Sequence, residues 1–217
     1  MTTKIFLAYH NEDISQFNHP DIIPIKLDQT EYFESEIFRM LTPDMIPDAD
    51  YIGLITPSIF RKVPSLTIET LFTQKPDPFA KLSLWLPDAL CDSIAVKYHG
   101  QMYIVIYLWL LEQLNIPMTI VNKYTAFYCN MWITKRPIFL EYLSLAKQAI
   151  KCLDSPPPHI QYALKTDPLY TGRLIGTGIL EKRFGKPYYP WQPFIMERLI
   201  CAFAYLKETN GQSSLEG

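Results

Sequence analysis

The sequence predicts an α/β protein built on one open sheet with crossover helices. Strand and helix signals alternate through roughly the first ninety residues, a pattern typical of strands joined by crossovers. The chain has 217 residues, of which 48% are hydrophobic and 14% aromatic, so we expect one domain with a large buried core. Because open α/β sheets bind ligands beyond the carboxyl ends of their strands, the residues after each strand are the first functional candidates.

Three short apolar runs in the first half predict buried strands that end in polar loops. They are residues 4–9 (KIFLAY), 22–27 (IIPIKL) and 51–56 (YIGLIT). Residues 34–41 predict a helix, because their apolar side chains recur at helical spacing after an acidic start. A helix over residues 64–72 and a strand over residues 82–86 complete this half.

The second half carries mostly helix signals. The longest apolar run, residues 102–111, is far shorter than the ~20 residues that a bilayer requires, so it predicts a buried helix. Residues 155–158 (SPPP) break the chain, and residues 159–190 are predicted to be loop. The expected elements are helices over 92–114, 136–153 and 192–207 and strands over 118–121 and 126–134.

Composition excludes several classes of function. Twenty basic and 22 acidic residues give a formal net charge of -2, which lacks the basic face of a nucleic-acid-binding protein. The chain shows neither a signal peptide nor a membrane span, so we predict a cytoplasmic protein. Its four cysteines are too far apart for a zinc motif and are expected to be reduced and structural: Cys91, Cys129, Cys152 and Cys201.

We expect one domain over residues 1–207. Residues 208–217 are polar and contain Gly211, Ser213 and Ser214. They are interpreted as a frayed end or as the start of a linker to further domains C-terminal to Gly217.

Polar side chains follow all three strands of the first half, and they suit a nucleotide. An aromatic ring can stack on a base, a carboxylate can bind ribose hydroxyls, and cations can neutralise a diphosphate. Each residue alone is more typical of a solvated loop, so the prediction rests on their joint placement at one sheet edge. The candidates are Tyr9, His10, Asp28, Thr56, Ser58, Arg61 and Lys62.

Four longer segments resemble nucleotide-sugar-dependent glycosyltransferases of the GT-A fold. The shared pattern is an acidic helix ahead of a DYIG strand, an NMWITK strand ahead of a helix, and a final helix with the letters ERL. The chain is most similar to viral and bacterial enzymes of polysaccharide synthesis, including chlorella-virus enzymes of capsid glycan synthesis. The segments are residues 27–41, 48–62, 126–147 and 188–206.

The resemblance implies a Rossmann-like GT-A domain with a central mixed, mostly parallel sheet flanked by helices. It also implies a UDP-sugar donor, a divalent cation (Mn²⁺ or Mg²⁺) and a hydroxyl of a growing glycan as the acceptor. Ser35 and Arg39, on the helix after the second strand, would join the donor site. Trp191 and Trp132 would flank the acceptor, although alternating aromatic residues on a strand are more typical of a core.

The metal ligands are where the chain departs from the family. Members of the family hold the cation with an Asp-x-Asp motif at the carboxyl end of a central strand. The match here, Asp48 and Asp50, precedes the YIGLIT strand instead. Asp77 and Asp88 are rival ligands. The alternatives are a metal held mostly by the donor diphosphate, or basic side chains that replace it.

The last helix is the second departure. Inverting members usually carry an acidic pair near its start, a short distance before an Arg, and the equivalent positions ahead of Arg198 are Trp191 and Gln192. Because an amide cannot act as a base near neutral pH, the sequence favours a retaining transfer in which the leaving phosphate accepts the proton. Glu197 or Asp88 would be the base if the product were inverted.

The predicted catalytic set is Gln192, Asp88 and His99, the last of which precedes a long helix and would face the acceptor or the diphosphate. A lone histidine is also typical of a plain hydrogen-bonded loop. Two other classes of function stay open. One is a nucleotide-binding domain without catalysis, and the other is a domain that binds glycan alone.

Overall fold

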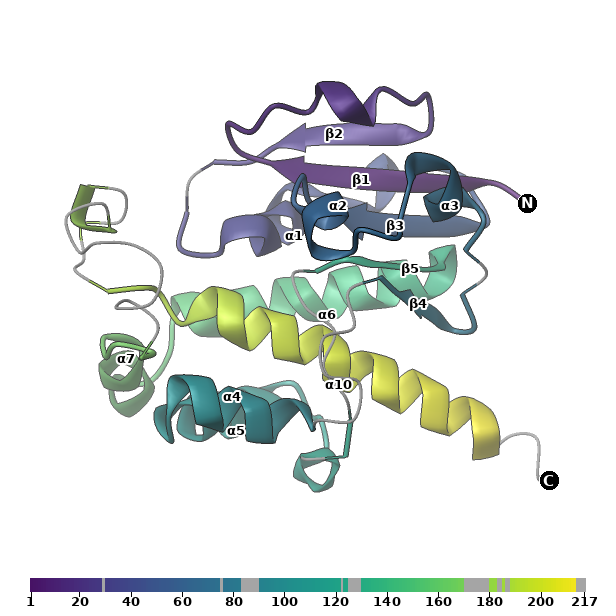
Figure 1. Ribbon diagram of the computed structural model, residues 1–217. Coiled ribbons are helices and arrows are strands. Elements are labelled where there is room, and N and C mark those ends of the chain that lie inside the picture. Colours follow the sequence, from purple (N-terminus) through teal and green to yellow (C-terminus); the bar gives the residue numbers. More distant parts are fainter. Residues whose placement is uncertain are drawn as a thin grey trace.

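A five-stranded sheet with the strand order β2-β1-β3-β5-β4 forms one layer of the protein (Figure 1). The computed structural model describes residues 1–28, 30–74, 76–82, 90–121, 123–124, 130–169, 180–182, 185 and 188–213, with only the backbone for 210–213. The strands are β1 (Thr3–Tyr9), β2 (Ile22–Lys26), β3 (Tyr51–Ile55), β4 (Phe79–Lys81) and β5 (Trp132–Lys135).

The sheet is mixed, and all its strands except β5 point the same way. β1 pairs in parallel with β2 and β3, whereas β5 is antiparallel to both β3 and β4. The predicted α/β class, with a mixed sheet flanked by helices, is therefore confirmed. From β2 the chain returns to the other side of β1 to form β3, so the strand order reverses between β1 and β3.

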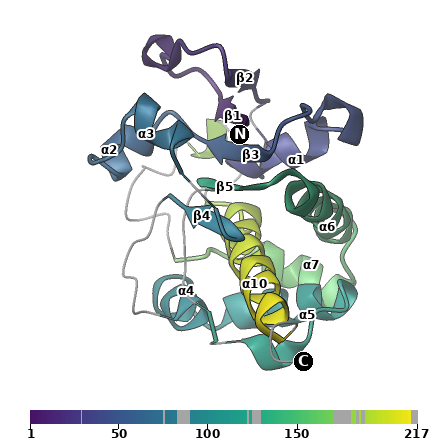
Figure 2. The same cartoon turned by 90° about the vertical axis from the view of Figure 1, so that its right-hand side faces the viewer.

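Helices cover both faces of the sheet. In Figure 2, α2 and α3 lie on one side of it, and α1, α6 and α10 lie on the other. The α-helices are α1 (Ile37–Met40), α2 (Ile59–Lys62), α3 (Ile68–Phe72), α4 (Cys91–His99), α5 (Met102–Gln113), α6 (Arg136–Asp154), α7 (Pro158–Leu164) and α10 (Gln192–Ser213). Short 3-10 turns are η1 (Ser15–Phe17), η2 (Phe33–Glu36), η3 (Pro43–Met45) and η4 (Met118–Ile120).

The strands bury both faces because their side chains alternate. In β1, Ile5 and Leu7 join the smaller apolar cluster beneath α2 and α3, whereas Phe6 and Ala8 join the main cluster. The near-continuous apolar runs of the sequence follow from this double burial.

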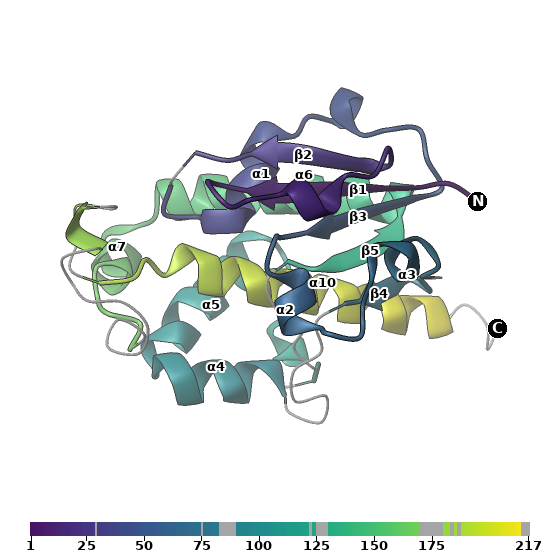
Figure 3. The ribbon, with the colours of Figure 1, turned by 45° about the horizontal axis from the view of Figure 1, so that its top comes forward.

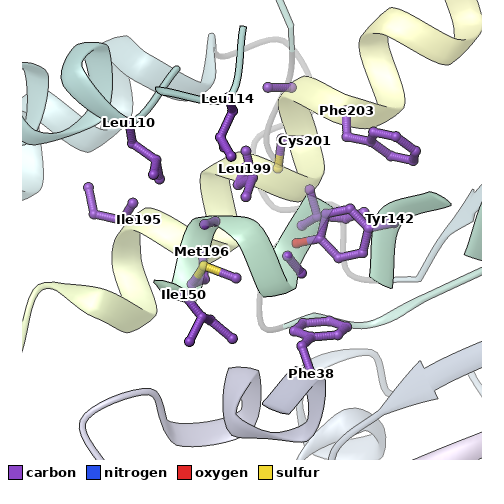
Figure 4. Close-up of a cluster of buried hydrophobic side chains, with 14 of the residues drawn as sticks. Phe38, Leu110, Leu114, Tyr142, Ile150, Ile195, Met196, Leu199, Cys201 and Phe203 are labelled. Carbon is purple, nitrogen blue, oxygen red and sulfur yellow. The ribbon is translucent and has the colours of Figure 1, made fainter. Parts of the chain in front are cut away.

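Helix α10 is the centre of the main core. It packs against α4, α5 and α6, and Figure 4 shows its Ile195, Met196 and Leu199 between Leu110 of α5 and Ile150 of α6. It thus joins the sheet layer to a second layer that α4, α5 and α7 form (Figure 1). Among the described residues, no helix is both long and apolar enough to cross a bilayer.

Several predicted elements have different bounds. The helix predicted over 92–114 is split into α4 and α5 at Gly100, whose positive φ of 80° ends α4. The strand predicted over 118–121 is wrong, because this stretch forms the 3-10 turn η4 after Pro117. Helix α7 lies in the predicted loop and begins at Pro158, a favoured first residue of a helix.

Two helices of the first half and two strands also differ from their predicted bounds. α2 was not predicted, and α3 begins at Ile68, after the Thr67 cap, rather than at residue 64. β4 ends at Lys81, before the predicted strand over 82–86, of which residues 83–86 lie outside the described residues. β5 begins at Trp132, and residues 126–129 of its predicted range are also outside them. α10 continues to Ser213, so residues 208–213 are helical.

Close packing at the centre of the sheet leaves no room for a side chain at Gly53 in β3. A methyl group at this position would lie 3.0 Å from Cγ1 of Ile133 and 3.1 Å from Cγ1 of Ile5. We expect Gly53→Ala to lower the free energy of unfolding by about 1–3 kcal/mol through overpacking, as measured by urea denaturation. In an Ile133→Ala background, Gly53→Ala should lower the free energy of unfolding by less, because the Ile133 side chain is gone. An unchanged free energy of unfolding for Gly53→Ala contradicts this packing.

Candidate functional site

The carboxyl ends of β1 and β3 form the point at which the strand order reverses. Figure 3 shows the arrowheads of β1, β2 and β3 pointing to the same edge, the edge at which α10 begins. His10 follows β1 there, and Thr56 and Ser58 follow β3, with their hydroxyl oxygens 2.9 Å apart. In open α/β sheets, this reversal opens the crevice in which ligands bind.

The turn η2 lies across this edge and packs against α10. Its Ser35 is buried and accepts a hydrogen bond from Nδ2 of Asn130, 3.0 Å away. Asn130 has a positive φ of 52°, a conformation that Asn tolerates better than most residues, and it directs the chain toward β5. Its Oδ1 is buried and has no hydrogen-bond partner within the described part of the chain.

His10 presents a second unpaired polar atom at the same edge. Its Nδ1 lies 3.3 Å from the carbonyl oxygen of Leu27, and because a carbonyl only accepts, Nδ1 is the donor. Nε2 is buried with no partner among the residues described. Buried polar atoms are normally paired, so a ligand with hydrogen-bonding groups would suit both His10 and Asn130.

Glu34 of η2 is surrounded by charged groups from three other elements. Burial raises the pKa of its carboxyl above the ordinary 4.5, and the charge of Glu197 raises it further, whereas Lys62 and His10 act in the opposite direction. The side chains that influence Glu34 come from the residue after β1, from α2 and from α10. We use the name carboxyl-edge cluster for His10, Glu34, Ser35, Lys62, Asn130 and Glu197.

Glu197 is held in place by a buried guanidinium. Nη1 of Arg198 lies 2.9 Å from the Glu197 carboxylate and also donates to the carbonyl oxygen of Phe194. Burial alone lowers the pKa of Arg198, but the charge of Glu197 and its other neighbours raise it overall, so the guanidinium stays charged. Glu34 and Glu197 thus differ in environment. One is a desolvated carboxyl beside a like charge, and the other is a carboxylate paired with a cation.

Two of these groups escaped the sequence analysis. Glu34 falls within the acidic start of the helix predicted over residues 34–41, and Asn130 is the first residue of the NMWITK segment, but neither was predicted as a site residue. Glu197 was the alternative base. No sequence signal distinguishes Glu34 from Glu36, since only the fold turns Glu34 toward α10 and gives Glu36 to Arg39, 3.2 Å away.

The structure places most of the predicted donor-site residues at this same edge. Tyr9 ends β1, Asp28 follows β2 and is exposed, and Arg61 and Lys62 are exposed on α2. Arg39 is different. Its guanidinium lies 2.7 Å from Asp154 of α6 and 3.2 Å from Glu36, and it covers the ring of Tyr32. These contacts hold it outside the carboxyl-edge cluster.

The predicted metal ligands lie at the opposite edge of the sheet. Asp50 directly precedes β3 and accepts a hydrogen bond from the backbone of Thr2. Asp48 stands two residues earlier, and Asp77 precedes β4 and lies 3.7 Å from Lys135, the cross-strand partner of Tyr51 at the start of β3. None of the three faces the carboxyl-edge cluster. Among the described residues, no three His, Cys, Asp or Glu side chains gather as a metal site.

The predicted aromatic walls are buried. Trp132 is 0% exposed and packs its ring on Phe139, Tyr142 and Phe79, so it cannot stack on an acceptor sugar. Trp191 is also 0% exposed, and its indole N–H donates to the carbonyl oxygen of Thr166. Both predictions of an acceptor-facing ring disagree with the structure, since alternate residues of a doubly covered strand or a helix start point into the core.

The predicted catalytic residues are only partly placed near the cluster. Gln192 begins α10 and donates from Nε2 to Glu31, 3.0 Å away. His99 is buried, donates from Nδ1 to the carbonyl oxygen of Pro168 and packs against the Phe194 ring, so it does not face a ligand. Asp88 lies outside the described residues.

Two shallow hollows elsewhere do not involve the cluster. One of about 500 Å³ is lined by Arg39, Lys147 and Lys151, and one of about 450 Å³ by Asp50, Lys135 and Arg136. We favour the carboxyl edge over both, because it alone combines the strand reversal with buried, unpaired polar atoms.

No family model, no curated protein and no solved structure is significantly similar to this chain.

The raised pKa of Glu34 predicts a pH-dependent stability. A carboxyl whose pKa is higher in the folded state stabilises the fold fully below its unfolded pKa, near 4.5, and that stabilisation is lost as the pH rises through the folded-state value. Relative to Glu34→Gln, the wild-type melting temperature should therefore fall as the pH is raised from 4.5 to neutral.

The matched control is Glu69→Gln on α3. Glu69 is an exposed carboxyl whose pKa is lowered, mainly by a hydrogen bond with Thr67. Relative to Glu69→Gln, the wild-type melting temperature should therefore rise over the same pH range. Melting curves that keep a constant gap between wild type and Glu34→Gln would refute the raised pKa.

Proposed function

We propose that this protein is a glycosyltransferase that moves a sugar from a UDP-sugar to a hydroxyl of a glycan acceptor. The observation that carries the proposal is the carboxyl-edge cluster at the strand reversal between β1 and β3. It combines carboxylates, unpaired polar atoms and a flanking cation. Sugar hydroxyls both donate and accept, so a hydroxyl-rich ligand would pair Nε2 of His10 and Oδ1 of Asn130, and the cation side of the cluster suits a diphosphate.

The donor would lie along the ends of the parallel strands. Tyr9, His10 and Asp28 would contact the nucleoside, with Asp28 accepting from ribose hydroxyls. Thr56 and Ser58 would donate to the diphosphate, and Lys62 would compensate the negative charge that develops as it leaves. Ser35, which is buried beneath Asn130, would position that amide and make no contact of its own.

The acceptor hydroxyl needs a base, and Glu197 is the group we assign. Its carboxylate is paired with Arg198 and lies beside the desolvated Glu34. The bond from the anomeric carbon to the diphosphate breaks as the acceptor oxygen attacks, and Glu197 takes the hydroxyl proton. The sequence favoured retention of the anomeric configuration, because Gln192 cannot act as a base. Since Glu197 on the same helix can, we propose that the configuration is inverted. NMR of the product distinguishes the two.

We keep the divalent cation in the proposal, but we assign it no protein ligands. Asp48, Asp50 and Asp77 lie at the amino edge, so they do not fit a cation bound beside the donor diphosphate. Charge compensation at the diphosphate would rely on Lys62.

A binding domain without catalysis is the second candidate. It is favoured by the ion pair of Glu197 with Arg198, which is also the arrangement of a purely structural carboxylate. The two candidates share the ligand site and differ in turnover.

Ligand binding is tested by melting the protein with UDP, GDP, CMP and their sugars, each with Mn²⁺ and with chelator. A ligand present at ~100 times its Kd adds about 2.7 kcal/mol, which corresponds to a rise of roughly 5–10 °C for a chain of this size. UDP compounds should raise the melting temperature, and Lys62→Ala should reduce the rise. If no nucleotide shifts the protein, the proposal fails. A shift by oligosaccharides alone would favour a glycan-binding domain.

Catalysis is tested by Glu197→Gln. Removing a general base should lower kcat by about 10²–10⁴-fold, while the shift by UDP persists because the nucleotide site is intact. Glu141→Gln is the matched control, since Glu141 also pairs with a cation, Lys207, but lies outside the cluster. Equal turnover in both variants would remove Glu197 from the mechanism, and no turnover in the wild type would favour the binding domain.

A further inference from the structure

The outer side of α5 is apolar where a surface helix normally carries polar residues. Val105 is 47% exposed, and Ile104, Leu108 and Trp109 are partly exposed, with Ile104 and Trp109 also packing against the main core. The opposite side, which includes Tyr103, Tyr107 and Leu110, is fully buried. We use the name α5 face for Ile104, Val105, Leu108 and Trp109, which a period of 3.6 residues brings to one side of the helix.

Polar groups bound the α5 face at both ends and carry opposite charge. Gln101 is exposed before its first turn, with Lys97 exposed at the end of the adjoining helix α4. Glu112 and Gln113 are exposed at its last turn. Neither Lys97 nor Glu112 has an ion-pair partner in the part of the chain that the structure describes.

We propose that the α5 face binds the α5 face of a second copy of this chain, with the two helices antiparallel about a two-fold axis. A two-fold interface must be self-complementary, so the apolar centre meets itself and each end meets the opposite end. Lys97 then faces the partner's Glu112, and the positive N-terminal end of each helix faces the negative C-terminal end of the other.

A lipid surface fits these residues less well. Interfacial helices combine an apolar face with an excess of Lys or Arg that attracts anionic lipids. The positive charge of Lys97 and the negative charge of Glu112 offset each other beside the α5 face, so these two residues supply no net attraction to anionic lipids. Insertion of the face would also bring Glu112 toward the acyl chains.

The size of the surface predicts a moderate affinity. A helix of 12 residues is about 18 Å long, which by itself falls short of the ~800 Å² that each partner buries in a stable interface. Met118, 55% exposed in η4, and Tyr162, 72% exposed on α7, are exposed apolar side chains of the two elements that pack against α5. The dimer should therefore form at micromolar to tens of micromolar concentrations.

Sedimentation equilibrium of the full chain tests the dimer directly. Wild type at concentrations well above this range should approach twice the monomer mass of 25.3 kDa, and Val105→Glu should stay near 25.3 kDa. Met45→Glu is the matched control, because Met45 is equally exposed at 47% but lies in η3, so this variant should still dimerise. Circular dichroism and melting temperature establish that all three are folded. A monomeric wild type, or a Val105→Glu variant as dimeric as wild type, overturns the proposal.

A charge-reversal cycle tests the antiparallel arrangement. Lys97→Glu and Glu112→Lys should each weaken dimerisation by about tenfold, and the double variant should restore it, because the opposed charges are exchanged. If the double variant is weaker than either single variant, the two residues do not face each other and the arrangement is wrong. A lipid surface would be the partner instead if the monomeric wild type sediments with phosphatidylcholine and phosphatidylglycerol vesicles and Val105→Glu does not.

Discussion

A buried chain of hydrogen bonds that joins α4, α5 and α10 is the constraint on which the two layers of the protein depend. Tyr107 of α5 donates to the backbone carbonyl oxygen of Arg198 in α10, and Tyr107 in turn contacts Tyr124, which donates to the buried Asp92 of α4. α10 itself contacts the sheet layer through α6 and the second layer through α4 and α5. Because buried polar groups must be paired, these contacts fix how α10 lies against the second layer.

The position of α10 decides which side chains can meet at the carboxyl edge. Glu197 precedes Arg198 and is held by it, and η2 packs against the same helix, which brings Glu34 close to Glu197. The reversal of strand order is common to open sheets, whereas the side chains that meet here depend on where one helix lies. The unpaired Nε2 of His10 and Oδ1 of Asn130 lie at the same edge.

The fold class was accessible from the sequence because strand periodicity and helix signals are local. The ends of β1, β2 and β3 were located within one or two residues, and so His10, Thr56 and Ser58 were placed at the right edge. The partners of a side chain are not local. Arg39 is taken by Asp154, 115 residues away, and Trp132 sits on a strand that is covered on both faces. The amino-edge position of Asp48 and Asp50, in contrast, follows directly from their place ahead of the YIGLIT strand in the sequence.

The length of α10 is a constraint of a different kind. The helix carries Glu197 at the carboxyl edge and, eleven residues later, Glu208 paired with Lys81 of β4 at 2.7 Å. Each residue of a helix turns the chain by about 100° and advances it by about 1.5 Å. An insertion or deletion of one residue between these two points would break the pairing at one end whatever residue it involved. Through evolution, this segment can therefore exchange side chains far more freely than it can change its length.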